Sequence, residues 1–450
     1  MSLRRLATLA FVFSASAHSG NDSLTDRAGR YLAELIRLDT SNPPGRESLV
    51  ARRLEQITRA EGIPCELLGA DPARLNFVAR LKSAAPKHRP LLLIAHSDVV
   101  PAPPAGWTVP PFSATVRDGF VYGRGALDDK SLLAAELAVL VELKRAGHPL
   151  TRDIILLSEA DEESGSTGMQ WLVRHAWASI DAEFALGEGG FSMNLPSGTN
   201  IYLVQTAEKS AMPVLLHASG PGGHGSLPRP DNPLVRLARA VVKLADAPQP
   251  VILNPTTRRY LAAISRVPDF AWLVPLTPQL ETPEGAAQLR DRDPELDAQL
   301  HTTISPDVFR GGTVVNAIPA AAEAQIDVRR APGDSADAVL DRLRRIVGDP
   351  QIRITRAPGH RIPSTPPSRT DTDLYRAMES VLRKSLVVPY LQRGATDAPW
   401  LRQKGVPVYG VPLFVQTEPE NRAHAVDERI SQAAFVDGVR LLRDIVMAVN

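Results

Sequence analysis

Apolar side chains follow two alternating patterns along the first two hundred residues. Apolar positions at helical spacing predict helices at residues 24–38, 47–61 and 131–146, and the start of another at 169–175. Between them, short apolar runs predict strands at residues 76–81, 91–95 and 153–157, of which the last two are almost fully apolar and therefore buried. Strands that alternate with helices favour an α/β fold, in which a sheet is flanked by helices.

The pattern changes after about Glu208. Strands are predicted at 214–218, 321–329 and 351–355 and helices at 234–245 and 335–347, whereas residues 250–300 are proline-rich with few periodic signals. The α/β character resumes with a helix at 372–386 and a strand at 406–411. We therefore predict a catalytic domain, residues 25–207 and 358–450, that is interrupted by an inserted α+β domain at residues 208–357.

The first residues form a separate feature. Arg4 and Arg5 precede an apolar run at residues 6–13, and small residues follow at 15–17. This order is typical of a secretory signal peptide, residues 1–17, and the apolar run is too short to anchor the chain in a bilayer. We expect a periplasmic or secreted protein.

Composition narrows the chemistry. The chain has 51 basic and 50 acidic residues, so no overall field attracts nucleic acid or an anionic membrane. Its single cysteine, Cys65, excludes an intramolecular disulfide and a thiolate metal cluster. A bound metal must therefore be held by nitrogen and oxygen ligands.

Histidines and acidic residues follow several of the predicted strands. His96 comes directly after the strand at 91–95, in an H-x-D motif with Asp98, and a lone motif of this kind is more often structural than metal-binding. Asp98 can accept the second imidazole N–H and so fix the tautomer. The other positions are Asp128 at a helix start, the acidic run 161–163, Glu188 and His424.

Two of these acidic sites also have a simpler explanation. Asp128 can complement a helix dipole, and the run at 161–163 can be a solvated loop. Their joint occurrence after buried strands instead favours a cation that neutralises them. Two histidines and several carboxylates suit zinc, cobalt or manganese, and five ligands exceed what one catalytic zinc needs. Two metal ions that share one carboxylate use all five.

An ordered set of motifs carries a resemblance to a known family. The motifs are HSDVV, WTVPPF, YGRGALDDK, DEES, EGG, GGHGS, GGTVVNAIP, DVR, GATDA and H-x-x-D-E. In this order they resemble the dinuclear zinc exopeptidase and amidohydrolase family, which includes carboxypeptidase G, carboxypeptidase S, aminoacylase and succinyl-diaminopimelate desuccinylase. The resemblance extends from about residue 30 to the C-terminus and is greatest for the carboxypeptidase S-like branch.

The resemblance implies roles for the candidate residues. It implies two Zn²⁺ ions, for which Co²⁺ or Mn²⁺ can substitute, one held by His96, Asp128 and Glu188. The other is held by Asp128, Glu163 and His424, so that Asp128 bridges. Asp98 orients His96, Glu162 is the general base, and a cis peptide bond follows Asp128.

Further implied roles fall in or near the inserted domain, which in this family carries a dimer-forming surface. His224 is implied to reach a neighbouring active site and stabilise the oxyanion, although GGHGS can also be a simple turn. Asn316 and Arg329 are implied to contact the substrate's carbonyl or carboxylate, although Asn316 can cap a turn and Arg329 can pair at the surface. Gly394 and Thr396 are implied to line the pocket.

The resulting hypothesis is a metal-dependent hydrolase of an amide bond next to a free carboxylate. Its substrate is a small peptide or an N-acyl amino acid, and carboxypeptidase, dipeptidase and deacylase activities all remain open. A catalytically silent relative that only binds peptides or amino acids is the alternative, but every expected catalytic residue is present. A serine hydrolase is excluded because no G-x-S-x-G motif occurs.

Overall fold

A computed structural model describes residues 22–358, 362–415 and 421–450. The predicted signal at residues 1–17 lies outside this part of the chain. The fold divides into two compact units, Met1–Ala182 with Leu413–Asn450, and Glu183–Pro412. Among the described residues, no helix has both the length and the apolar character that crossing a membrane requires.

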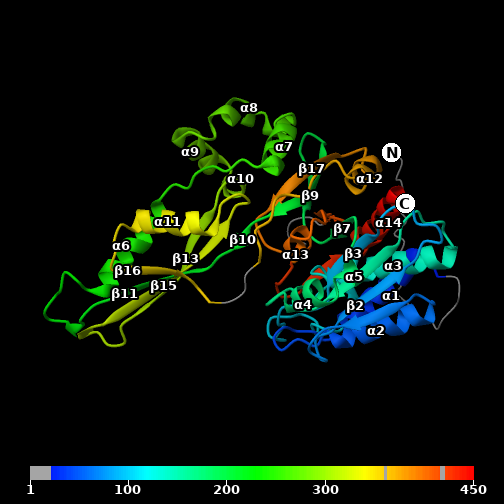
Figure 1. Ribbon diagram of the computed structural model, residues 1–450, viewed down its shortest axis with the longest axis horizontal. Helices are drawn as coiled ribbons and strands as arrows, with labels where there is room; N and C mark the ends of the chain where they lie inside the picture. The colour runs from blue at the N-terminus through cyan, green and yellow to red at the C-terminus, as the bar shows by residue number, and fades with distance from the viewer. Residues whose placement is uncertain (1–21, 359–361, 416–420) are drawn as a thin grey trace, which may run out of the picture. The chain divides into compact units, whose positions relative to one another are not determined.

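The first unit contains an α/β sheet whose central strands are buried. Its strands run in the order β1 (Cys65–Leu68), β2 (Asn76–Leu81), β6 (Ile154–Glu159) and β3 (Leu91–His96). Helices α1 (Leu24–Ile36), α3 (Lys130–Ala146) and α14 (Gln432–Val449) pack together, and α3 also packs on β3 and β6 (Figure 1). Helix α2 (Ser48–Ala60) packs on β1 and β2.

The direction of β3 and β6 determines where polar side chains gather. The two strands are parallel, with Leu91 opposite Ile154 and His96 opposite Glu159. Their carboxyl ends therefore meet at one edge, and the segments that begin at His96 and Asp161 leave the sheet side by side. The remaining elements of this unit are β4 (Thr115–Arg117), β5 (Phe120–Tyr122), β19 (Arg429–Ser431), α4 (Thr167–His175) and α5 (Trp177–Ile180).

A buried glutamate lies in helix α3. Glu136 has no exposed surface. Neither of its carboxylate oxygens has a partner with normal hydrogen-bond geometry. A contact with the backbone of Ile94 offsets only part of the effect of burial on the pKa. Burial raises the pKa of Glu136 well above its usual value. Between the usual glutamate pKa and this raised pKa, the folded chain keeps a proton that the unfolded chain releases. The free energy of unfolding therefore decreases as the pH rises through this interval.

Replacing Glu136 by glutamine is expected to raise the Tm at pH 8 by about 2–4 °C, the shift that roughly 1 kcal/mol produces in a domain of this size. The gain is expected to shrink toward about pH 3, well below the usual glutamate pKa, where the glutamate is protonated in both states. Differential scanning calorimetry across this pH range measures the effect, with Glu142→Gln on the same helix as the control. A Glu136→Gln Tm that tracks the wild type at every pH would contradict the assignment.

The second unit contains a mixed sheet and a helical layer. Its strands run in the order β7 (Phe184–Gly187), β18 (Val408–Gly410), β9 (Asn200–Glu208) and β17 (Leu386–Gln392), and β8 (Phe191–Asn194) pairs with β9. The sequence predicts a helix through 386, but α12 (Asp373–Val381) ends five residues earlier. That prediction is wrong at its end, because the β-branched and aromatic residues of 387–390 join a parallel pair with β9.

Residues 250–300, which gave few periodic signals, form short helices: α7 (Pro255–Ile264), α8 (Leu273–Leu276), α9 (Pro283–Arg292) and α10 (Pro294–Gln299). Three of them begin with proline directly after a capping side chain, from Asn254, Thr282 or Asp293. These local start signals were present in the sequence. The apolar sides of the helices pack against one another and against β9 and β17.

A five-stranded antiparallel sheet also lies in the second unit. Its order is β10 (Ser210–Ala211), β15 (Ala321–Arg330), β11 (Val214–Ser219) and β16 (Ile352–Arg356), and β13 (Thr303–Gly311) pairs with β15. Buried and exposed residues alternate along most of β15, so one face packs against α6 (Pro233–Asp246) and α11 (Ala336–Val347). Beyond this sheet, β12 (Gly223–His224) pairs with β14 (Ala317–Ile318). The predicted boundaries at 208 and 357 stay a prediction.

Candidate metal centre

His96 is the last residue of β3 and is almost fully buried. Its Nδ1 lies 2.9 Å from the main-chain oxygen of Asp98 and 3.6 Å from the Asp98 carboxylate. Because a carbonyl oxygen can only accept, Nδ1 carries a hydrogen, and Nε2 is the ring nitrogen that can give its lone pair to a metal when one is bound. Nε2 lies 2.8 Å from Oδ1 of Asp128.

Asp128 lies between two imidazole rings. While Oδ1 contacts His96, Oδ2 lies 3.1 Å from Nε2 of His424. Burial alone would raise the pKa of Asp128, but the hydrogen bonds with His424 and His96 outweigh it and lower that pKa well below its usual range. The peptide bond after Asp128 is cis, which confirms that prediction.

His424 also contacts Glu163. Its Nε2 lies 3.1 Å from Oε1 of Glu163, so the two carboxylates share this nitrogen. Hydrogen bonds with Asp128 and Glu163 raise the pKa of His424 to about 10, against the opposing effect of burial. In the metal-free chain, a proton on His424 therefore offsets part of the negative charge beside it.

These residues fit a metal ion. Ligand atoms of His96, Asp128 and Glu163 all lie within 4.8 Å of one another, and His424 closes the group. A divalent cation would take the place of the His424 proton and neutralise both carboxylates. Imidazole nitrogen combined with carboxylate oxygen is a donor set for zinc and related divalent ions.

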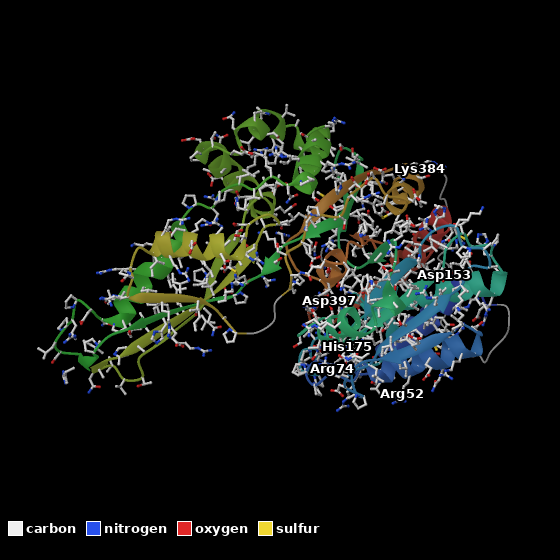
Figure 2. All side chains as sticks on the ribbon, in the orientation of Figure 1. Arg52, Arg74, Asp153, His175, Lys384 and Asp397 are labelled. Carbon is white, nitrogen blue, oxygen red and sulfur yellow. The ribbon has the colours of Figure 1, made fainter. Side chains whose placement is uncertain are left out.

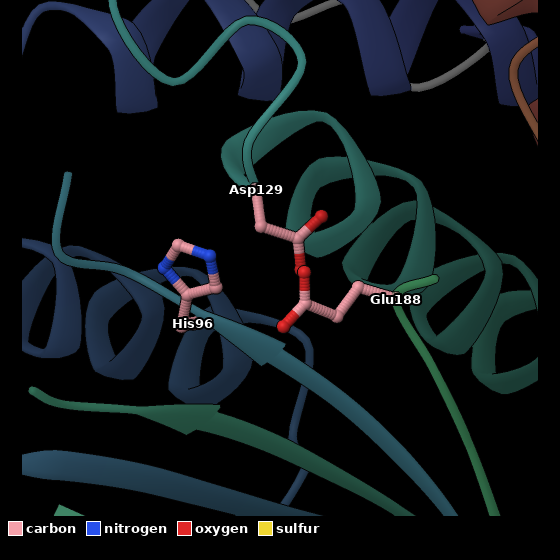
Figure 3. Close-up of side chains that lie close together, drawn as sticks. All are labelled: His96, Asp129 and Glu188. Atoms are coloured by element: carbon pink, nitrogen blue, oxygen red, sulfur yellow. The ribbon is translucent and has the colours of Figure 1, made fainter. Parts of the chain in front are cut away.

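Asp129 adds a second carboxylate beside His96. The ligand atoms of His96 and Asp129 also lie within 4.8 Å of each other (Figure 3). The sequence analysis gave Asp129 no role, although it is the second acid of the DDK motif. Glu188, which Figure 3 also draws, belongs to the second unit, where it directly follows β7 and is half-buried.

The Asp98 carboxylate positions the acidic loop after β6. Its two oxygens accept from the backbone amides of Glu162 and Glu163, both at 3.1 Å, and Asn42 Nδ2 donates to it at 2.8 Å. Burial would raise the pKa of Asp98, but its hydrogen bonds, including those with His96 and Asn42, lower it. Asp98 therefore contacts His96 mainly through its main chain and fixes the backbone of Glu162 and Glu163 through its side chain.

Asp161, predicted only as part of the acidic run, and two residues from other segments complete this loop. Asp161 has a positive φ of 69° and accepts from Asn42 Nδ2 and Arg74 Nη2, both at 2.9 Å. Arg74, labelled in Figure 2, also binds the buried Glu47. Asn42 thus joins Asp98 to Asp161, although in the sequence it stands out only as part of a proline-rich turn.

The substrate-contact candidates lie at separate places within the second unit. His224 and Asn316 are exposed and adjoin through the β12–β14 pair, where Gly225 N donates to Asn316 O at 2.8 Å. β14 comes shortly before the start of β15, whereas Arg329 lies near the end of β15, where its Nε binds Asp327. Thr396 is buried and bonds to Glu208, whereas Gly394 is exposed. The strand from Ala321 to Arg329 extends about 26 Å at the usual rise per residue.

The chain matches peptidase family M20/M25/M40 over residues 92–448. It is 30% identical over 380 residues to the human N-fatty-acyl-amino acid synthase/hydrolase PM20D1, covering 81% of this chain and 75% of that protein. It is 28% identical to the probable carboxypeptidase S-like 2 of Dictyostelium discoideum, covering 80% and 71%.

A solved structure gives the same picture of the fold. The M20 family metallo-carboxypeptidase Sso-CP2 from Sulfolobus solfataricus matches with a TM-score of 0.71 at 19% identity, covering 94% of this chain and 99% of that one. The predicted fold class is thereby confirmed: an α/β catalytic domain that carries an inserted α+β domain.

Proposed function

Because the chain belongs to peptidase family M20/M25/M40, and is therefore a metal-dependent hydrolase of amide bonds next to a free carboxylate, we propose that it uses two zinc ions to release the amino acid from N-acyl amino acids. The observation that carries this proposal is the placement of Asp128 between His96 and His424, with one carboxylate oxygen toward each ring. The substrate class is supported by the similarity to the human N-fatty-acyl-amino acid hydrolase.

The proposed roles are supported by the geometry of the first unit and by the family resemblance. His96, Asp128, Glu163 and His424 would hold the metal, with Glu188 as the fifth ligand carried over from the family resemblance. When bound, the ions supply Lewis-acid polarisation and lower the pKa of water. Glu162, whose backbone is fixed by Asp98, takes the proton of the attacking water and delivers it to the leaving amine. Arg329 offers a planar fork that suits the substrate carboxylate.

The test combines metal analysis with a substrate panel. Elemental mass spectrometry of the purified chain is expected to find about two zinc ions per chain. Hydrolysis of N-acyl amino acids with short and long acyl groups is compared with hydrolysis of dipeptides and of longer peptides. Amine release that a chelator abolishes and zinc restores supports the proposal; no metal and no activity after adding zinc or cobalt would favour a binding protein instead.

Carboxypeptidase activity is the second candidate. It is supported by the similarity to the carboxypeptidase S-like protein and to Sso-CP2. Both activities leave the same product, an amino acid with a free carboxylate, and differ only in the group on the other side of the amide bond. Faster release from peptides than from N-acyl amino acids in the same panel would select this candidate.

We further propose a homodimer in which His224 acts in the partner's active site. In an N-acyl amino acid the carboxylate adjoins the scissile amide, whereas His224 and Arg329 lie near opposite ends of a strand about 26 Å long. One small substrate cannot contact both residues of the same chain. The exposed apolar side chains Leu227, Val314 and Val315, close in sequence to His224 and Asn316, support a covered surface.

Replacing His224 by alanine is expected to lower kcat by about 10²–10³-fold, the usual effect of losing one oxyanion donor, without loss of metal. Mixing His224→Ala with Glu162→Gln chains is expected to restore part of the activity, because a mixed dimer contains one site with both residues. His217→Ala is the control, since this histidine lies on β11 in the same unit and has no proposed role. Absence of restored activity in a mixture shown to contain mixed dimers would contradict a shared site.

Export to the periplasm or the medium is also proposed, on the basis of Arg4, Arg5 and the apolar run at 6–13. N-terminal sequencing of the mature protein tests it, and cleavage after residue 17 is the expected result. An intact N-terminus on the active protein would overturn it.

A further inference from the structure

A buried ion pair lies beside the candidate metal ligands in the first unit. Arg124 and Glu428 are 3% and 0% exposed, and Nη1 of Arg124 donates to Oε2 of Glu428 at 2.5 Å. Removing two charges from water costs free energy that their attraction does not always recover. The position of this pair therefore calls for an explanation other than stability.

The pair contacts the main chain of two ligand segments. Oε1 of Glu428 accepts from the backbone amides of Leu127 and Asp128, at 2.8 and 3.2 Å. On the other side, Nη2 of Arg124 donates to the main-chain oxygen of His424 at 3.1 Å. One ion pair thus connects the backbone of Asp128 to the backbone of His424.

We propose that Glu428 and Arg124 are positioning residues that set the spacing between Asp128 and His424 for metal binding. The inference rests on the proposed metal centre, in which Asp128 and His424 are ligands. Their side chains already meet, with 3.1 Å between Asp128 Oδ2 and His424 Nε2. A shift of either backbone segment would change that spacing directly, and groups that orient metal ligands in this way strongly affect metal affinity.

Two substitutions remove the connection without removing a ligand. Glu428→Gln has the same shape but only one acceptor oxygen, so its amide N–H₂ must face either the backbone amides or the Arg124 guanidinium. Either orientation places donor against donor. Arg124→Lys keeps the positive charge but loses the planar fork that reaches Glu428 and His424 together.

The experiment measures zinc affinity of the full-length chain by competition with a chromophoric chelator. Both variants are expected to bind zinc about 10–100-fold more weakly than the wild type. The control is Asp334→Asn in the second unit, which breaks another buried carboxylate–arginine contact, with Arg342 at 2.6 Å, and is expected to leave zinc affinity unchanged. Circular dichroism confirms that each variant is folded.

A second readout separates positioning from a general loss of stability. In the cobalt-loaded protein, the visible absorption spectrum reports ligand geometry, and it is expected to change in Glu428→Gln and Arg124→Lys but not in Asp334→Asn. If Glu428→Gln does not fold, Arg124→Lys carries both measurements. Wild-type zinc affinity and an unchanged cobalt spectrum in the folded variants would overturn the inference, whereas a wild-type chain that binds no metal would overturn the proposed function itself.

Discussion

Replacing Glu162 by glutamine is expected to lower kcat by about 10²–10⁴-fold, the usual contribution of a general acid–base group, and to leave the metal content unchanged. Glutamine has nearly the same shape but cannot take a proton from water or return one to the leaving amine. The backbone of residue 162 stays fixed, because its amide still donates to Asp98. The effect should therefore appear in turnover and not in folding or metal binding.

Steady-state kinetics and elemental mass spectrometry on the same preparation check this expectation. The matched control is Ser164→Ala, an exposed position in the same loop. A Glu162→Gln enzyme that retains most of its turnover would remove Glu162 from the role of general base. Loss of metal together with activity would instead indicate that Glu162 holds the metal.

Replacing Asp128 by asparagine is expected to abolish both activity and high-affinity metal binding. The aspartate offers one oxygen toward each imidazole, whereas asparagine offers one oxygen and an N–H₂ group that cannot bind a cation. The loss in affinity should exceed about 100-fold, the upper end for groups that only orient a ligand. It should also exceed the effect of Glu428→Gln, which leaves the Asp128 side chain intact.

Chelator competition measures this loss, and Asp118→Asn, at an exposed aspartate nearby in sequence, is the control. The Tm provides an independent check. Added zinc should raise the Tm of the wild type, because a ligand that binds only the folded state stabilises it, and should not raise that of Asp128→Asn. Zinc binding to Asp128→Asn at wild-type affinity would rule out a bridging role.

The sequence predicted the buried strands and the chemistry at their ends because both depend on local patterns. The run at 76–81 coincides with β2, and the run at 91–95 with β3 except for His96, which the structure adds as its last residue. Apolar runs bounded by turn residues identify such strands directly. His96 was predictable as a ligand because it lies at the end of such a strand. Polar groups at the carboxyl edge of an α/β sheet are brought together by the fold.

The groups that position the ligands were not predictable, because their partners are distant in the chain. Arg124 and Glu428 are separated by 304 positions, and Asn42 and Asp161 by 119. Asn42 resembled a turn residue, and Glu428 only the end of a motif. The helix at 372–386 was extended too far for a related reason, since pairing with β9 overrides local helix propensity.

Positive φ angles in the two ligand-bearing loops have a consequence for the metal-free chain. Asp161 and Ser166 in one loop, and His424 and Asp427 in the other, adopt a left-handed backbone that non-glycine residues normally avoid. Such conformations persist only where surrounding contacts enforce them, and a bound cation adds to those contacts. Without it, we expect these loops to open more often than in the metal-bound chain, with faster amide hydrogen exchange and earlier attack by proteases. The lifetime of the enzyme, and not only its activity, would then follow the supply of metal.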